Sequence, residues 1–224
     1  MREPIVLSWS GGKDSSLALA ALQADPAVEV VALLTSVTRG YDRISIHGVR
    51  RTLLEAQARG LGLPLFEVAL EPACSNADYE AAFRSAAHEL RARFPTLRRI
   101  AFGDLFLGEV RAYREALLAS VGLEGHFPLW ALDTRTLAER FVALGYRARL
   151  VCVDTTQLAP SFAGRPFDAR LLADLPASAD PCGERGEFHT FVSDGPIFAT
   201  PVSHGVGEVV MRDERFAYCD LLDA

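Results

Sequence analysis

The fold is decided near the N-terminus by residues 4–23, which read PIVLSWSGGKDSSLALAALQ. Residues 4–9 form a short apolar run that predicts a buried strand, and residues 15–23 carry a polar start and then apolar side chains, which predicts a helix. Ser10, Gly11 and Gly12 connect the two. A strand, a glycine turn and a helix in this order form the first unit of an α/β sheet, with a loop that can hold an anion.

The rest of the N-terminal half repeats the alternation of strand and helix. We expect strands over 28–38, 65–70 and 98–102, helices over 48–61, 79–94 and 107–120, and a short fifth unit at 126–130. Continuously apolar strands that alternate with helices predict a parallel sheet covered on both faces. The expected fold class is therefore α/β, and ligands are expected at the carboxyl ends of the strands.

The pattern changes near residue 130. A helix over 134–144 and a strand over 147–153 are followed by a loop rich in proline and glycine. Beyond the loop, residues 188–192 and 197–222 alternate apolar and polar side chains, which predicts short antiparallel strands. We therefore expect two domains, residues 1–130 and residues 131–224, of which the second is a smaller α+β unit.

Composition and charge exclude several classes of protein. Half of the residues are hydrophobic and 23% are charged, which is typical of a globular chain. The formal net charge is −6, and no block of five like charges occurs, so we expect no bulk nucleic acid among the partners.

No apolar run approaches the roughly 18 residues of a membrane span. Cys74, Cys152, Cys182 and Cys219 show neither CxxC nor zinc-finger spacing. We expect a cytoplasmic protein with reduced thiols and no membrane contact.

The loop from Ser8 to Ser16 contains groups that hold a phosphate. Backbone amides at a helix N-terminus attract an anion, and adjacent glycines let the main chain approach it. Lys13, the one lysine beside 22 arginines, adds a cation, and Ser10 and Ser15 add hydroxyl donors. The loop is not a Walker A loop, because Asp14 follows the lysine, and it does not fit GxGxxG. The alternative is a structural turn capped by Asp14 or Ser15.

A second charged segment, residues 180–196, reads DPCGERGEFHTFVSDGP and leads into a predicted strand. Glu184 and Glu187 stand three residues apart, and His189 follows two residues later. Such a set could bind Mg²⁺, orient an amine or act as a general base. The alternative is a solvated turn whose acids are simply exposed.

Both segments carry a resemblance to known proteins. The SGGKDSS string after a first strand resembles the PP-loop of the N-type ATP pyrophosphatases, a branch of the adenine nucleotide alpha hydrolase superfamily. The second segment resembles the DPCGENGEFHTFVxDGP signature of the diphthine–ammonia ligase family, in which Asn usually stands where this chain has Arg185. Further segments agree in family order, among them residues 47–51, 57–58, 62–65, 103–106, 128–130 and 162–165.

The resemblance implies a Rossmann-like sheet of the HUP type and an ATP-dependent ligase of the EC 6.3 class. Such an enzyme adenylates a carboxylate, releases pyrophosphate and transfers ammonia. ATP and Mg²⁺ are the implied cofactors, and the implied partners are ammonia and a small-molecule or protein-borne carboxylate whose identity stays open, as does a homodimer. One alternative is a PP-loop tRNA-modifying thiolase, against which the negative charge argues. Another is a non-catalytic ATP-binding module, against which the acids and histidine of the second segment argue.

The candidate site follows from the two segments and the resemblance. The catalytic candidates are Lys13, Asp14, Glu184, Glu187 and His189. The nucleotide-binding candidates are Ser8, Ser10, Gly11, Gly12, Lys13, Asp14, Ser15, Ser16, His47, Gly103 and Asp104. Asp14 and Asp104 are the candidate ligands of Mg²⁺, with a helix cap as the alternative role of Asp104. Which of the two glutamates acts as the base stays open, and we expect Cys182 to be structural rather than a sulfur-transfer nucleophile.

Overall fold

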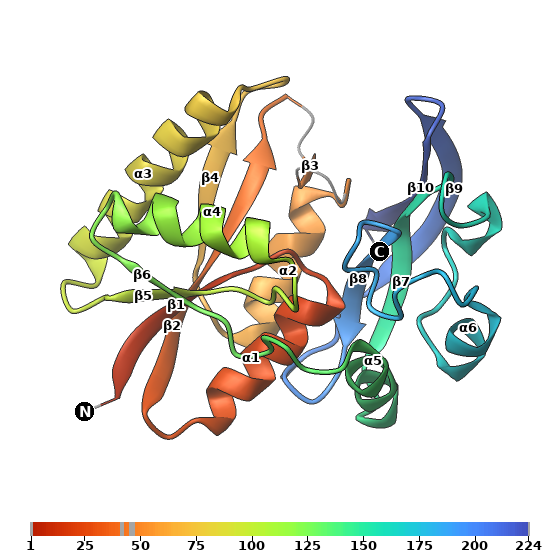
Figure 1. Ribbon diagram of the computed structural model, residues 1–224, viewed down its shortest axis with the longest axis horizontal. Coiled ribbons are helices and arrows are strands. Elements are labelled where there is room, and N and C mark those ends of the chain that lie inside the picture. Colours follow the sequence, from red (N-terminus) through yellow and green to blue (C-terminus); the bar gives the residue numbers. More distant parts are fainter. Residues whose placement is uncertain (1, 41–42, 45–47, 224) are drawn as a thin grey trace.

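The N-terminal part is built on a parallel sheet (Figure 1), in a computed structural model that describes residues 2–40, 43–44 and 48–223. β1 (Glu3–Ser8) lies between β2 (Val28–Thr38) and β5 (Arg99–Ala101). β4 (Leu65–Leu70) pairs with β2, and β6 (Glu124–His126) pairs with β5. Within the described ranges these five strands run parallel, and the short β3 (Arg43–Ile44) lies antiparallel to the end of β2. The predicted Rossmann-like α/β fold is confirmed.

Helices cover both faces of this sheet, as predicted. α1 (Lys13–Ala24) and α2 (Arg51–Leu61) pack on one face, and α3 (Asn76–Arg93) and α4 (Gly108–Ala119) pack on the other. Side chains of β1 alternate between the two cores: Ile5 and Leu7 belong to the cluster of α1 and α2, and Val6 belongs to that of α3 and α4. This alternation is what the period of two along a strand requires when both faces are buried.

The C-terminal part contains a second, antiparallel sheet. Its strands are β7 (Arg147–Asp154), β8 (Phe188–Asp194), β9 (His204–Arg212) and β10 (Phe216–Asp223), in the order β8-β7-β10-β9. The chain between the parallel sheet and β7 forms α5 (Thr134–Ala143), and the loop between β7 and β8 forms the 3-10 helix η1 (Pro160–Phe162) and α6 (Ala169–Asp174). The sequence predicted the antiparallel tail but neither of these two short helices.

The two sheets share a hydrophobic core. Leu19 of α1 and Leu53 of α2 belong to the same buried cluster as Val151 of β7 and Phe191 of β8. α1 and α2 therefore separate the parallel sheet from the antiparallel one, and α1 contacts β8 directly. Because the core runs through both halves, the division into residues 1–130 and 131–224 stays a proposal.

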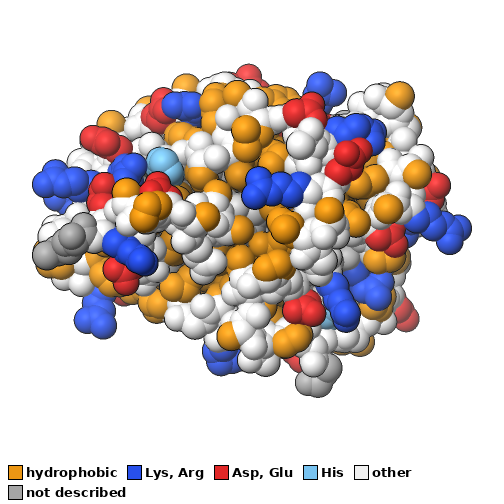
Figure 2. Space-filling model, turned by 90° about the horizontal axis from the view of Figure 1, so that it is seen from below, with side chains coloured by type: hydrophobic (Ala, Val, Ile, Leu, Met, Phe, Trp, Pro, Cys, Tyr) orange, Lys and Arg blue, Asp and Glu red, His pale blue; other side chains and the backbone are white. Residues whose placement is uncertain are grey.

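The surface carries charges of both signs. On the face seen in Figure 2, side chains of Lys and Arg lie among those of Asp and Glu and among apolar side chains, and the basic ones do not gather in one place. Among the described helices, none is both long and apolar enough to cross a membrane.

Candidate active site

A cavity of about 270 Å³ lies where the glycine loop meets the second charged segment. Its wall comes from the carboxyl ends of β1 and β5, the start of α1 and the loop before β8. Of the predicted site residues, those that line it are Ser8, Ser10, Gly12, Lys13, Asp14, Ser15, Gly103, Asp104, Glu184 and His189. Gly11, Ser16 and Glu187 are not among its lining residues, and His47 lies outside the described residues. The structure thus brings together groups that are far apart in the sequence.

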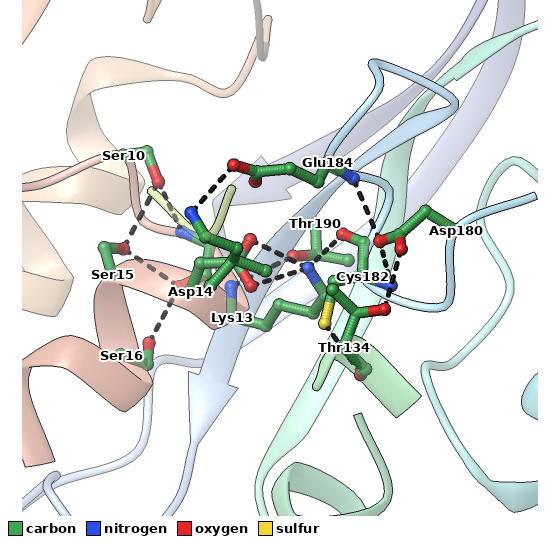
Figure 3. Close-up of polar contacts among 12 residues, drawn as sticks. Ser10, Lys13, Asp14, Ser15, Ser16, Thr134, Asp180, Cys182, Glu184 and Thr190 are labelled. Atoms are coloured by element: carbon green, nitrogen blue, oxygen red, sulfur yellow. Dashed lines mark hydrogen bonds and ion pairs between the residues drawn. The ribbon is translucent and has the colours of Figure 1, made fainter. Parts of the chain in front are cut away.

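Hydroxyl groups of the glycine loop turn toward one another at the start of α1 (Figure 3). The Ser15 and Ser16 hydroxyls each donate to the Gly12 carbonyl oxygen at 2.9 Å, and the Oγ atoms of Ser10 and Ser15 are 3.2 Å apart. Ser10 and Ser15 also line the cavity, whereas Ser16 is fully buried. Ser10 and Ser15 can therefore reach an anion in the cavity, and the Ser16 hydroxyl serves the first turn of the helix.

Two contacts hold the loop against β8. The backbone N–H of Lys13 donates to Thr190 Oγ1 at 3.0 Å, and the backbone N–H of Val192 donates to the Gly11 carbonyl oxygen at 2.9 Å. A Cβ added to Gly12 would lie 3.0 Å from the Thr190 carbonyl oxygen. The glycine pair thus permits close packing of the loop on the C-terminal strand, a role that the sequence did not reveal.

Lys13 is buried, and its ammonium connects the two segments. Nζ donates to both carboxylate oxygens of Asp14, at 2.8 and 2.7 Å, and to the carbonyl oxygen of Cys182. It also lies 5.7 Å from the centre of the Phe188 ring. Burial, the largest single effect, disfavours the charged form, but Asp14, Cys182 and Glu184 together outweigh it, and the pKa of Lys13 is raised above its usual value. The lysine expected to face a phosphate is therefore also part of the protein interior.

Asp14 and Asp104 are the carboxylates that the sequence assigned to Mg²⁺. Asp104 Oδ2 lies 2.7 Å from Arg114 Nε, so each acid has a cationic partner. No cluster of three or more His, Cys, Asp or Glu side chains with the spacing of a metal site occurs in the described part of the chain. Mg²⁺ typically takes one or two carboxylates and completes its shell with phosphate oxygens and water. Asp14 and Asp104 can provide the one or two carboxylate ligands of a magnesium–nucleotide complex.

Glu184 reaches from the second segment to the turn after β5 (Figure 3). Its Oε1 accepts a hydrogen bond from the backbone N–H of Leu105 at 2.8 Å. Burial raises the pKa of Glu184 to about 7; the Leu105 hydrogen bond opposes this shift, and the nearby carboxylates of Asp14 and Asp104 add to it. A carboxyl group that titrates near neutral pH and lines the cavity has the property of a general acid or base.

Glu187 occupies a different position from the one expected. It is fully buried, and its two carboxylate oxygens accept hydrogen bonds from the backbone N–H groups of Asp180, at 2.7 Å, and Arg185, at 3.0 Å. Its side chain therefore shapes the loop from within instead of facing the cavity. The catalytic role predicted for Glu187 stays a prediction, and these contacts favour a structural role of its carboxylate in the loop.

Asp180 organises the same loop. Its carboxylate accepts hydrogen bonds from the Thr134 hydroxyl at 2.7 Å, the backbone N–H of Cys182 at 2.9 Å and the backbone N–H of Glu184 at 3.3 Å (Figure 3). The sequence alone did not indicate a role for this carboxylate. A carboxylate that begins a turn and receives backbone N–H groups is a common device for fixing loop geometry.

His189 lines the cavity beside Lys13. Burial and, to a lesser extent, the charge of Lys13 lower the pKa of His189 to about 4. The imidazole is therefore neutral at pH 7, and in this form it does not act as a general acid. As a neutral ring it can still orient a substrate through one donor and one acceptor nitrogen.

Cys182 is buried with its thiol against the Thr134 carbonyl oxygen, 3.2 Å away. Burial raises the pKa of Cys182 to about 12 despite the nearby Lys13. Since the thiolate is the nucleophile, this environment suits a structural cysteine and not a sulfur carrier.

We expect Cys182 to resist alkylation by iodoacetamide in the native protein at pH 8, because its thiol is both inaccessible and protonated. Cys74 is partly exposed and should be labelled first. Peptide mass spectrometry after quenched labelling measures both sites, and urea-unfolded protein provides the control in which all thiols react. Native labelling of Cys182 as fast as Cys74 would contradict the structural assignment.

Two family models match successive parts of the chain. Residues 2–125 match the family model described as diphthamide synthase N-terminal domain, and residues 133–213 match the one described as diphthamide synthase C-terminal domain. A diphthine–ammonia ligase of Schizosaccharomyces pombe is 27% identical over 225 residues, a match that covers 89% of this chain and 37% of that protein. The chain thus spans little more than a third of the length of this relative.

Proposed function

The chain belongs to the diphthamide synthase family, and on that premise we propose that it is an ATP-dependent ligase that joins ammonia to a carboxylate. One observation carries the proposal: the glycine loop, with Ser10 and Ser15, faces the same cavity as Glu184 and His189. Activation of a carboxylate by ATP requires the phosphates and the acceptor to meet at one place, and a shared cavity provides this proximity.

The first step in this proposal is adenylation. A carboxylate oxygen of the acceptor attacks the α-phosphorus of ATP, the bond from that phosphorus to the oxygen of the β-phosphate breaks, and pyrophosphate leaves. The N-terminus of α1 and the hydroxyls of Ser10 and Ser15 would hold the departing negative charge. Asp14 and Asp104, together with the nucleotide, would hold Mg²⁺, which would supply positive charge at the same place.

The second step transfers ammonia. The nitrogen attacks the acyl carbon of the acyl-adenylate, the bond from carbon to the AMP oxygen breaks, and the amide and AMP form. The attacking nitrogen must lose a proton, and Glu184 is the cavity carboxylate whose pKa of about 7 lets it accept one at neutral pH. His189 remains neutral and is assigned to orienting the acceptor.

ATP consumption is expected to yield AMP and pyrophosphate, because the proposed first step is an attack on the α-phosphorus. The test incubates the protein with ATP, Mg²⁺, ammonium and a carboxylate acceptor, and separates the nucleotides by ion-exchange chromatography. Diphthine, named in the S. pombe relative, is one acceptor, and a panel of small carboxylates forms the second arm.

ADP and phosphate as the main products would contradict the proposal. ATP binding without turnover under any acceptor would favour a nucleotide-binding module instead. Tight and salt-sensitive binding of tRNA would favour the thiolase alternative, since phosphate contacts weaken as salt increases.

A further inference from the structure

Gln57 is a buried polar residue of α2 that belongs to neither motif. Its side chain is fully buried. Nε2 donates to the Gly11 carbonyl oxygen at 2.9 Å and to the Val192 carbonyl oxygen at 2.6 Å, and Oε1 accepts from Trp9 Nε1 at 2.9 Å. One amide thus joins the end of β1, the glycine loop and β8.

The chemistry of these partners requires an amide. Two carbonyl oxygens need donors, and the indole N–H needs an acceptor, so the three contacts together also fix which end of the amide carries the nitrogen. A carboxylate at this position would face two carbonyl oxygens and could not donate a hydrogen bond to either. An apolar side chain would leave all three groups buried without this partner.

The contact with Gly11 is close enough to set the shape of the loop. Gly11 has φ +78°, and a Cβ at this position would lie 2.7 Å from Gln57 Oε1. Its carbonyl oxygen accepts hydrogen bonds from Gln57 and from the backbone N–H of Val192. A glycine in the left-handed region whose carbonyl oxygen accepts two hydrogen bonds has little freedom to change its backbone angles.

We propose that Gln57 is a positioning residue that fixes the glycine loop to β8 and thereby couples the nucleotide site to the second motif. It does not line the cavity, so it acts through Gly11 and Val192 and not by touching a reactant. Thr190 lies on β8 two residues from Val192, and its hydroxyl oxygen accepts a hydrogen bond from the Lys13 backbone N–H. The conformation of the glycine loop and that of β8 therefore depend on each other. Such coupling is reciprocal by thermodynamic necessity.

The test compares Gln57→Met, which keeps the length of the side chain but removes its donors and its acceptor oxygen, with Gln23→Met on the exposed surface of α1. Hydrogen exchange should become about tenfold faster in peptides covering residues 9–16 and 188–194 of the Gln57 variant, the change expected for one lost set of buried hydrogen bonds. Exchange in α3 should stay as in the wild type. The Gln23 variant should match the wild type throughout.

The affinity for ATP, measured by calorimetry, should fall about tenfold in Gln57→Met and stay unchanged in Gln23→Met. This part rests on the proposed function, whereas the exchange measurement does not. If the wild type itself binds no ATP, the proposed function fails, and the exchange pattern still decides whether Gln57 positions the loop.

Two exchange patterns would overturn the inference. Equal acceleration in α3 and in the two loop segments would mean that Gln57 supports only global stability. Unchanged exchange in both segments would mean that the loop is held without it. If Gln57→Met does not fold, Gln57→Asn keeps the amide and shortens its reach, and the same pattern is expected from it.

Discussion

Glu184→Gln is expected to lower steady-state turnover, measured as amide formation and as the pyrophosphate released with it, by about 10²-fold or more, the range of general acid–base effects. ATP affinity should change by less than about threefold, because Gln can still accept the hydrogen bond from the Leu105 backbone. Calorimetry measures the affinity, and a coupled assay measures pyrophosphate. Glu208→Gln, on the exposed surface of β9, is the matched control and should behave as the wild type.

The pH profile gives this prediction a second readout. A base must be ionised, and Glu184 has a pKa of about 7, so at a fixed concentration of unprotonated ammonia the wild-type rate should fall as pH decreases through 7 and level off above it. His189, with a pKa of about 4, does not titrate in this range. The residual rate of Glu184→Gln should lack this pH dependence. Equal losses of ATP affinity and turnover in Glu184→Gln would instead assign Glu184 to the nucleotide site.

The sequence predicted the bounds of β2 and β4 best. The runs at 28–38 and 65–70 match these strands at both ends, because mostly apolar segments bounded by turn residues leave little choice of boundary. α3 begins at Asn76 and not at 79, because Ser75 and Asp78 form a capping box with Asp in place of the usual Glu or Gln. The short β6 and α6 carry too few residues to produce a periodic signal.

For the candidate site, the sequence predicted residues that the fold brings together, but not how they pack. Ser10 and Asp14 of the first motif, Glu184 of the second motif, and Asp104 after β5 line one cavity. Glu184 and Glu187 could not be told apart, because only the turn fixed by Asp180 decides which carboxylate points inward to the loop and which lines the cavity. Gln57 stands in one of the segments that resemble the family, but the sequence did not indicate its role, since its partners are backbone carbonyls and an indole far away in the sequence.

Lys13 is a further residue whose packing the sequence did not predict. Its place in a glycine loop predicts a contact with phosphate, and a cation at the surface could make this contact without affecting the fold. In the structure its ammonium is enclosed between Asp14, the Cys182 carbonyl oxygen and aromatic rings. Removing it therefore changes the interior as well as the cavity.

Lys13→Met is expected to reduce the free energy of unfolding by about 3–5 kcal/mol, the range for breaking a buried ion pair from one side. The substitution leaves the Asp14 carboxylate and the Cys182 carbonyl oxygen without this donor. Urea unfolding followed by circular dichroism measures the effect. Since the fold raises the pKa of Lys13 above 10.5, its charge is fully present at lower pH, and the loss of stability should stay constant between about pH 6 and 9.

The double variant Lys13→Met/Asp14→Asn distinguishes the ion pair from simple loss of packing. Neutralising Asp14 removes the uncompensated carboxylate, so the double variant should be more stable than Lys13→Met alone, and the non-additivity measures the pair. An unchanged urea midpoint for Lys13→Met, together with loss of ATP affinity, would contradict the interior role. In that case the ammonium would leave Asp14 and Cys182 when the nucleotide binds, and Lys13 would act on the phosphates directly.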